Sequence, residues 1–167
     1  MKSQHIPGVF VIGAMATVLT ACNPPTPIAL VATPDAIRTE IESSKAPLTL
    51  VHAWATWCGP CREEFPELVD IQKAFSKKGL RLILVSADEP SDVETVETFL
   101  SEQGSPIDSL VSTELSQEFI ETLSPKWAGS LPASFFYVDG KLVEEWEGKR
   151  TYEQYAKTIE THINNKE

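Results

Sequence analysis

Two cysteines separated by two residues are the part of this chain best suited to chemistry. They lie in the stretch WATWCGPC, residues 54–61, as Cys58 and Cys61. A cysteine pair at this spacing can cycle between dithiol and disulfide, bind a metal ion, or form a structural cross-link. These three uses make different demands on the rest of the sequence.

Cys58 is expected at the start of a helix. The segment PLTLVHAW, residues 47–54, is almost continuously apolar and predicts a strand buried on both faces. From residue 59 to about 77, apolar residues approximate helical spacing, with Pro66 as the expected kink. Unpaired N–H groups and the helix dipole lower the pKa of a cysteine at a helix N-terminus. Cys58 is therefore the predicted nucleophile, and Cys61 is the predicted resolving cysteine.

The spacing of the two cysteines favours a bond that opens and closes. One helical turn brings their Cα atoms within the ~4.4–6.8 Å that a disulfide accepts. Closing so short a loop removes little entropy from the unfolded chain, which disfavours a purely structural cross-link. A zinc site needs two further ligands, and the remaining candidates offer no second pair at a usable spacing. These candidates are His5, His52, His162 and Cys22.

Copper binding by the reduced thiols remains an alternative. Cu(I) is a soft ion that prefers thiolate ligands. No Met-rich tract accompanies the cysteines, because both methionines of the chain precede Cys22. We predict that the protein has no metal site and needs no cofactor.

The N-terminal segment has the layout of an export signal. Lys2 precedes a largely apolar run from Val9 to Leu19, and small residues then lead to Cys22. The apolar stretch is shorter than the ~20 residues of a membrane-spanning helix. The ending LTAC resembles a bacterial lipobox, which implies that Cys22 is lipidated and becomes the new N-terminus. The alternative is an ordinary signal peptide that is cleaved nearby.

Composition and the N-terminal signals predict one exported domain. A length of 167 residues with 42% hydrophobic residues suits a single core. The formal charge of −10 disfavours nonspecific binding to nucleic acid or to an anionic membrane surface. We expect a signal peptide at 1–21, a lipid anchor with a Pro-rich tether at 22–33, and a domain at 34–167. Export would place the remaining thiols where disulfides persist.

Strand and helix patterns alternate through the domain. This alternation predicts an α/β fold with a core of parallel strands. The turn signal Asp139-Gly140 predicts a hairpin within residues 133–148. The other expected elements are a helix capped by Thr33 with Pro34 at its first position, a strand at 80–87, a helix at 91–104, a short helix at 112–123 and a final helix through 152–163.

The active-site segment resembles that of a known family. WCGPC, residues 57–61, matches the thioredoxin active-site motif in every residue. The longer WATWCGPCREEFPEL resembles the TlpA/ResA branch of exported thioredoxin-like proteins, and the resemblance extends over about residues 46–165. It implies a thioredoxin fold, with a central mixed sheet flanked by helices. Trp57, Gly59 and Pro60 would then belong to the active site.

The resemblance assigns further residues to the site. Pro132 matches the family's cis-proline, and Leu131 before it would face the disulfide and pair with the substrate backbone. Glu64 matches a glutamate that lines the active-site cavity, although a solvated helix position is the alternative. Glu89 aligns loosely with a second acidic position, and for this residue a solvated charge is the favoured reading.

His52 departs from the family's pattern. Thioredoxins carry a buried aspartate six residues before the first cysteine, where this chain has His52. Strand alternation places His52 on the same side as Trp54, so its side chain is expected to be buried. Two hypotheses stay open: His52 relays a proton to or from Cys61, or it is a neutral core residue held by a hydrogen bond.

These observations predict a membrane-anchored extracytoplasmic thiol–disulfide oxidoreductase. It would reduce disulfides of exported proteins, with cytochrome c maturation as one setting that the resemblance suggests. The expected partners are exported proteins with cysteines or disulfides, an upstream thiol reductant and, through the lipid on Cys22, the membrane of the cell envelope. Its domain would face the periplasm or extracytoplasmic side. We expect a monomer that binds no nucleic acid. The alternative functions are Cu(I) binding or delivery and disulfide isomerisation.

Overall fold

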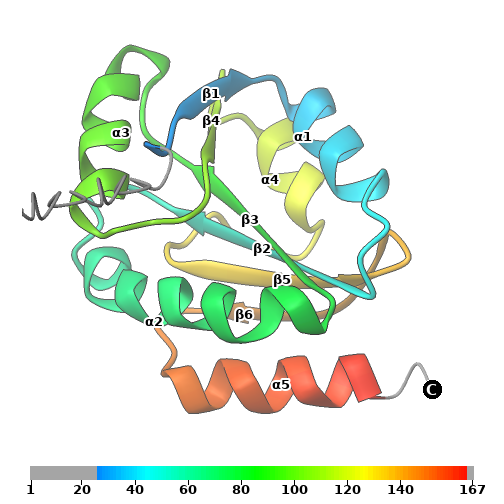
Figure 1. Cartoon of the computed structure of the whole chain (residues 1–167). Helices are drawn as coiled ribbons and strands as arrows, with labels where there is room; N and C mark the ends of the chain where they lie inside the picture. The colour runs from blue at the N-terminus through cyan, green and yellow to red at the C-terminus, as the bar shows by residue number, and fades with distance from the viewer. Residues whose placement is uncertain (1–25, 165–167) are drawn as a thin grey trace, which may run out of the picture.

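A six-stranded mixed sheet forms the centre of the protein, with helices on both faces (Figure 1). The computed structural model describes residues 26–164, so the predicted signal peptide and Cys22 lie outside the described residues. The strand order is β1-β4-β3-β2-β5-β6. The four strands β1 to β4 pair in parallel, whereas β5 and β6 are antiparallel. The α/β class and the mixed sheet expected from the sequence are thereby confirmed.

The element bounds agree closely with the sequence patterns for the longer elements. The strands are β1 (Ala29–Ala32), β2 (Leu48–Trp54), β3 (Leu80–Ser86), β4 (Ser109–Ser112), β5 (Ala133–Val138) and β6 (Lys141–Glu147). The helices are α1 (Pro34–Glu42), α2 (Gly59–Phe75), α3 (Val93–Glu102), α4 (Gln117–Leu123) and α5 (Tyr152–Asn164), with short 3-10 turns η1 (Ser76–Lys78) and η2 (Pro90–Asp92). Within residues 26–164, no helix combines the length and the apolar character needed to cross a membrane.

Strand β2 separates the two halves of the hydrophobic core. Every residue of β2 is buried, as its apolar run predicted. Leu50 and Trp54 face the cluster built with α2, α3 and α5, whereas Val51 and Ala53 face the cluster built with α1 and α4. On the first face, Trp54, Phe65 and Phe99 form a cluster of three rings with centroids 5.0 to 5.1 Å apart. This aromatic cluster joins the end of β2 to α2, directly beneath the loop that carries Cys58.

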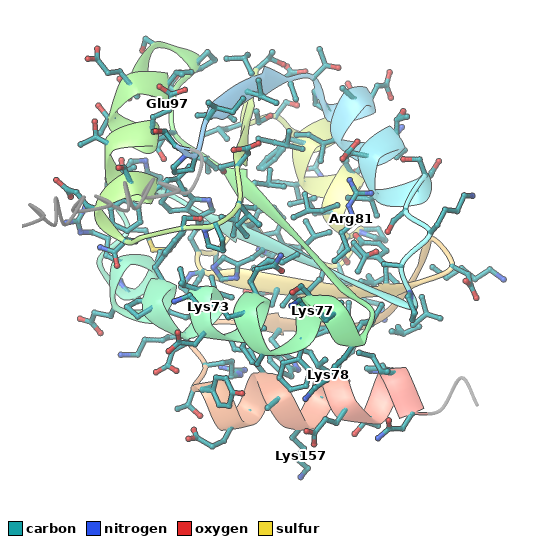
Figure 2. All side chains as sticks on the ribbon, viewed as in Figure 1. Lys73, Lys77, Lys78, Arg81, Glu97 and Lys157 are labelled. Carbon is teal, nitrogen blue, oxygen red and sulfur yellow. A yellow bond between two sulfur atoms is a disulfide. The ribbon has the colours of Figure 1, made fainter. Side chains whose placement is uncertain are left out.

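The sequence patterns missed β1 and β4. Residues 29–32 belong to the range 22–33 that was expected to be a tether, but they pair with β4 at the edge of the sheet. The ordered sheet thus begins before the expected domain start at 34. Contacts from distant residues hold β1: the Ala29 N–H donates to the Glu97 carboxylate at 3.0 Å, and the Ile28 N–H donates to Asp108 at 2.9 Å. Figure 2 shows Glu97 on α3 beside β1.

Removing a ring from the aromatic cluster should destabilise the protein. Phe99→Ala leaves a cavity between Trp54 and Phe65, and we expect a loss of about 3–5 kcal/mol in the free energy of unfolding. Urea denaturation followed by tryptophan fluorescence measures it. Val143→Ala is the control, because Val143 is 46% exposed on edge strand β6 and should change stability by less than about 0.5 kcal/mol. Equal losses in both variants would contradict a central role for the cluster.

Candidate active site

Cys58 occupies the N-cap position of α2, which confirms its predicted place at the helix start. It forms a disulfide with Cys61, and the two Cα atoms are 5.2 Å apart. The Cys61 N–H donates a hydrogen bond to Cys58 Sγ at 3.2 Å, so the first turn of the helix contacts this sulfur directly. Cys58 is 6% exposed and Cys61 is fully buried. An incoming thiol or disulfide therefore reaches Cys58 before Cys61.

The loop before Cys58 is held by a buried carboxylate that the sequence analysis did not identify. Asp88, just after β3, accepts hydrogen bonds from the Thr56 N–H at 2.9 Å, from the Thr56 hydroxyl and from the Ser86 hydroxyl. Asp88 is 1% exposed, whereas Glu89, the position considered from the sequence, is exposed. The favoured interpretation of Glu89 as a solvated charge is confirmed. The neighbouring Asp88 makes the contacts that hold the loop.

An apolar hollow of about 230 Å³ lies beside the cysteines. Trp57, next to Cys58, is 66% exposed and forms part of its lining. Leu131 contributes from the other side, and the Leu131–Pro132 peptide bond is cis, as expected. The remaining lining residues come from the end of β3, from α4 and its flanks, and from the following loop: Ala87, Leu115, Phe119, Ile120, Trp127, Ala128 and Gly129.

Gly59 and Pro60 form the exposed bridge between the two cysteines. A Cβ added at Gly59 would meet no atom within 4 Å, so the fold does not require glycine there. Other residues would therefore fit at position 59 without a steric clash, so redox properties rather than packing can determine which residue occurs there. Pro66 lies inside α2 and has no N–H to donate to the preceding turn.

A buried polar cluster joins β2, α2, β5 and α5 within the core. It consists of His52 on β2, Glu64 on α2, Ser134 on β5 and Tyr155 on α5, all 2% exposed or less. His52 and Ser134 are paired in register on neighbouring strands, and His52 Nδ1 lies 3.0 Å from Ser134 Oγ. The Ser134 and Tyr155 hydroxyl oxygens are 2.7 Å apart. Tyr155 donates to Glu64 Oε1 at 2.8 Å.

Burial sets the protonation of this cluster. It lowers the pKa of His52 to about 3, so the imidazole is neutral. The 3.8 Å approach of His52 Nε2 to Glu64 Oε2 is therefore not an ion pair. Burial also raises the pKa of Glu64, although hydrogen bonds from Tyr155 and the Arg150 N–H oppose this shift. The predicted burial of His52 is confirmed, and Glu64 is a buried carboxyl rather than a solvated helix charge.

Sequence reasoning placed some of these residues and missed others. Pattern and resemblance identified both cysteines, His52 and Glu64. The structure joins the two cysteines and places His52 against Glu64, which lies on the helix that Cys58 caps. Ser134 and Tyr155 had no distinguishing sequence signal, because each contributes only through the position of its strand or helix. Within residues 26–164, no group of three or more His, Cys, Asp or Glu side chains is placed to hold a metal ion.

Asp88→Ala should loosen the loop that carries Trp57 and Cys58. The substitution leaves the half-buried Thr56 donors and the buried Ser86 hydroxyl without their acceptor, at an expected cost of about 1–3 kcal/mol in unfolding free energy. The reactivity of Cys58 toward a model disulfide should also fall. Chemical denaturation and stopped-flow thiol exchange measure the two effects. Glu89→Ala, which removes the exposed neighbouring charge, should leave both unchanged; a matching loss there would refute the assignment to Asp88.

Comparison with known proteins identifies the family. Residues 31–145 match the model of the AhpC/TSA family. The thiol-disulfide oxidoreductase ResA of Bacillus thuringiensis (strain Al Hakam) is 32% identical over 137 residues, which cover 75% of each chain. A homolog of the thiol:disulfide interchange protein DsbE from Paracoccus denitrificans is 28% identical over 109 residues, covering 64% of this chain and 54% of the relative.

Solved structures confirm the fold. StoA from Bacillus subtilis superimposes with a TM-score of 0.57 at 21% identity, over 70% of this chain and 85% of StoA. A thioredoxin-related protein from Neisseria meningitidis serogroup B gives a TM-score of 0.62 at 24% identity, over 74% of this chain and 90% of that protein. The chain is therefore a thiol–disulfide oxidoreductase with a thioredoxin-like fold, and it belongs to the AhpC/TSA family.

Proposed function

We propose that the protein reduces disulfides of exported proteins through a Cys58–Cys61 cycle. The observation that carries the proposal is the asymmetry of the two sulfurs: Cys58 caps α2 and keeps some exposure, whereas Cys61 is fully buried. The Cys58 thiolate attacks a substrate disulfide, forms a mixed disulfide and releases one substrate thiol. Cys61 then loses its proton and attacks Cys58 Sγ, which releases the second substrate thiol and restores the disulfide. An upstream thiol reductant supplies two electrons to reopen it.

The apolar hollow beside Cys58 supports an extended protein segment as the substrate. Trp57 and Leu131 offer apolar contacts on its two sides. Within residues 26–164, the Leu131 backbone forms no hydrogen bond, so its N–H and C=O are available to a substrate strand. A cysteine of such a segment would be held over the Cys58 sulfur, which is the position that exchange requires.

The reducing direction rests on the residues between the cysteines. Gly59-Pro60 is the dipeptide of reductases in the thioredoxin group, whereas isomerases and oxidases usually carry histidine next to the second cysteine. Reduction potentials in this group span roughly 150 mV, or about 7 kcal/mol for a two-electron couple. Measuring the potential of this couple therefore tests the direction of the reaction.

The proposed location is the cell envelope, with the domain on the periplasmic or extracytoplasmic side. The support is the export signal at 1–21 and the lipobox-like sequence that ends at Cys22. A lipid on Cys22 would tether the domain to the membrane through the Pro-rich segment that follows. Exported proteins with cysteines, including apocytochromes c, are the substrate class that this location provides.

Replacing each cysteine separately should reveal its role. Cys61→Ser is expected to accumulate a mixed disulfide with a protein substrate such as insulin, because the attacking thiol remains and the resolving thiol is absent. Cys58→Ser should form none, since Cys61 is buried. Non-reducing gel electrophoresis detects the adduct, and the wild-type protein with dithiothreitol should reduce insulin catalytically. Trapping by Cys58→Ser alone would reverse the assigned roles.

The same preparations separate the alternative functions. A copper-delivery protein would retain Cu(I) at a stoichiometric ratio in its reduced form and turn over little disulfide. An isomerase would restore activity to scrambled ribonuclease. Either result, without insulin reduction, would contradict the proposed reductase function.

Cys22→Ala should abolish membrane attachment. When the full chain is produced in a bacterium, we expect the wild-type protein to incorporate a labelled fatty acid and to sediment with membranes. The Cys22→Ala variant should do neither, because the acyl acceptor is missing. Cys58→Ser, which removes a different thiol, should remain labelled. An unlabelled wild-type protein with a mature N-terminus other than residue 22 would disprove the lipoprotein assignment.

A further inference from the structure

All of the protein's net charge comes from one segment of the chain, residues 82–125. This segment contains ten of the 24 Asp and Glu residues and none of the 14 Lys and Arg residues. The other 14 acidic residues are balanced by the 14 basic ones, so the segment accounts for the whole formal charge of −10. It forms most of β3 and then η2, α3, β4 and α4, whereas α2 and α5 belong to the part of the chain that is neutral as a whole (Figure 1).

Parallel pairing brings two loops of this acidic segment to the edge of the sheet that carries the active-site loop. In the register of the sheet, Trp54, Ser86 and Val111 lie side by side on β2, β3 and β4. The three strands therefore end at the same edge. The loop with the reactive sulfur follows β2, Glu89 follows β3 and Glu114 follows β4, and both glutamates are exposed. The active-site loop thus shares its edge of the sheet with two exposed carboxylates.

The apolar hollow beside the cysteines is bordered by three exposed carboxylates. Each lies one or two residues from a side chain of the lining, and the three, which we name the acidic rim, are Glu89, Glu114 and Glu118. Within residues 26–164, none of the three takes part in an ion pair. Residues this close in the chain are at most about 7 Å apart at their Cα atoms, which is less than the Debye length of about 8–10 Å in ~0.1–0.15 M salt. The field of the rim therefore reaches a segment in the hollow.

Three basic side chains near this edge do not offset the rim. Arg62 donates to the Thr56 carbonyl at 3.2 Å and shares a second hollow with two glutamates of α3. Lys126 shares a third hollow with two glutamates of β6. The Lys149 ammonium is paired with Glu63 on α2. Because each base is matched or outnumbered by carboxylates, we expect a negative potential over the apolar hollow.

A partner that docks in the hollow must suit both its apolar lining and the charge around it. The lining contains no charged side chain, so an apolar side chain of the partner gains free energy by contact with it. Asp and Glu side chains of the partner would be repelled by the rim, whereas Lys and Arg would be attracted. Such charge complementarity raises the rate of association more than the affinity. This property suits an enzyme that must release its product after each exchange.

We propose that the hollow and the acidic rim select protein segments with an apolar side chain beside the reactive cysteine and Lys or Arg around it. In the exchange, the Cys58 thiolate attacks the disulfide of the segment and one segment thiol leaves. Cys61 then gives up its proton, attacks Cys58 Sγ and releases the second segment thiol, so the dithiol is oxidised and the substrate is reduced. The rim acts before these bonds change, by steering the segment to the hollow. This inference rests on the proposed reduction of exported proteins and adds the charge class of the segments.

Two synthetic peptides of opposite charge test this selection. Each has capped ends and one cysteine next to a leucine, and is used as its disulfide-linked dimer; one peptide carries two lysines where the other carries two glutamates. The reduced full-length protein, in an uncharged detergent, is mixed with each dimer, and chromatography follows the release of peptide thiol. Dividing each rate constant by that of uncharged dithiothreitol with the same dimer removes differences in intrinsic reactivity. The lysine peptide should react at least about tenfold faster at about 10 mM ionic strength, and about threefold faster at about 150 mM.

Removing charge from the rim should remove most of this preference. The variant Glu114→Gln/Glu118→Gln lacks two of the three rim charges, and its ratio at about 10 mM ionic strength should fall to about threefold or less. The matched control Glu42→Gln/Glu160→Gln also removes two exposed charges and should keep more than half of the wild-type ratio. Glu160 lies on α5, and Glu42 lies beside Gly140 in the turn between β5 and β6, at the opposite end of the sheet. The charge of the attacking thiolate is common to both peptides and cancels in the ratio.

The outcomes separate this inference from the proposed function. Equal rates for the two peptides at both ionic strengths, or a faster reaction of the glutamate peptide, would overturn the inference and leave the reductase function standing. A full ratio in the rim variant, or equal losses in the rim and control variants, would also overturn it, because the preference would then not arise at the rim. A total absence of exchange with both peptides would overturn the proposed function itself.

Discussion

The burial of β2 on both faces determines where the reactive sulfur can lie. Because each residue of this strand packs into one half of the core or the other, the strand cannot shift along its neighbours without exposing apolar side chains. The chain leaves β2 at Trp54, whose ring packs against α2 and α3, and α2 begins only a few residues later. Packing of Trp54 thus fixes where the chain leaves the sheet, and the Asp88 and Cys61 contacts hold the loop and the sulfur at the helix start.

The apolar hollow and the buried polar cluster give the site two environments of different polarity. The hollow is lined mostly by apolar side chains, with the exposed Trp57 among them, which suits the protein segment proposed as substrate. The polar cluster that includes Glu64, on the helix that Cys58 caps, is closed to solvent and holds a carboxyl, an imidazole and two hydroxyl groups. Burying such groups costs free energy unless they bond to one another, and three contacts of hydrogen-bond length join these four side chains.

The sequence was most informative where a residue's role depends on its near neighbours. The position of Cys58 follows from a strand and a helix that are adjacent in the chain, and the burial of His52 follows from alternation within one strand. The cis bond at Pro132 and the place of Glu64 came from resemblance to a family. Strands β1 and β4 were missed because four residues show no period, and they are held by each other and by Glu97. Asp88 and Tyr155 were missed because their partners, Thr56 and Glu64, are 32 and 91 residues away along the chain.

Helix α5 contributes Tyr155 to the buried cluster although it is the last element of the domain to be synthesised. A chain made from its N-terminus presents both cysteines long before α5, and their bond spans only a separation of three residues. Tyr155, by contrast, arrives near the end of synthesis and can reach Glu64 only once α5 packs against α2. The disulfide can therefore form before the native structure, whereas the buried polar cluster is complete only when α5 is in place. An unfinished chain would carry the motif in a chemically simpler form, as two thiols without the buried groups that accompany them in the mature fold.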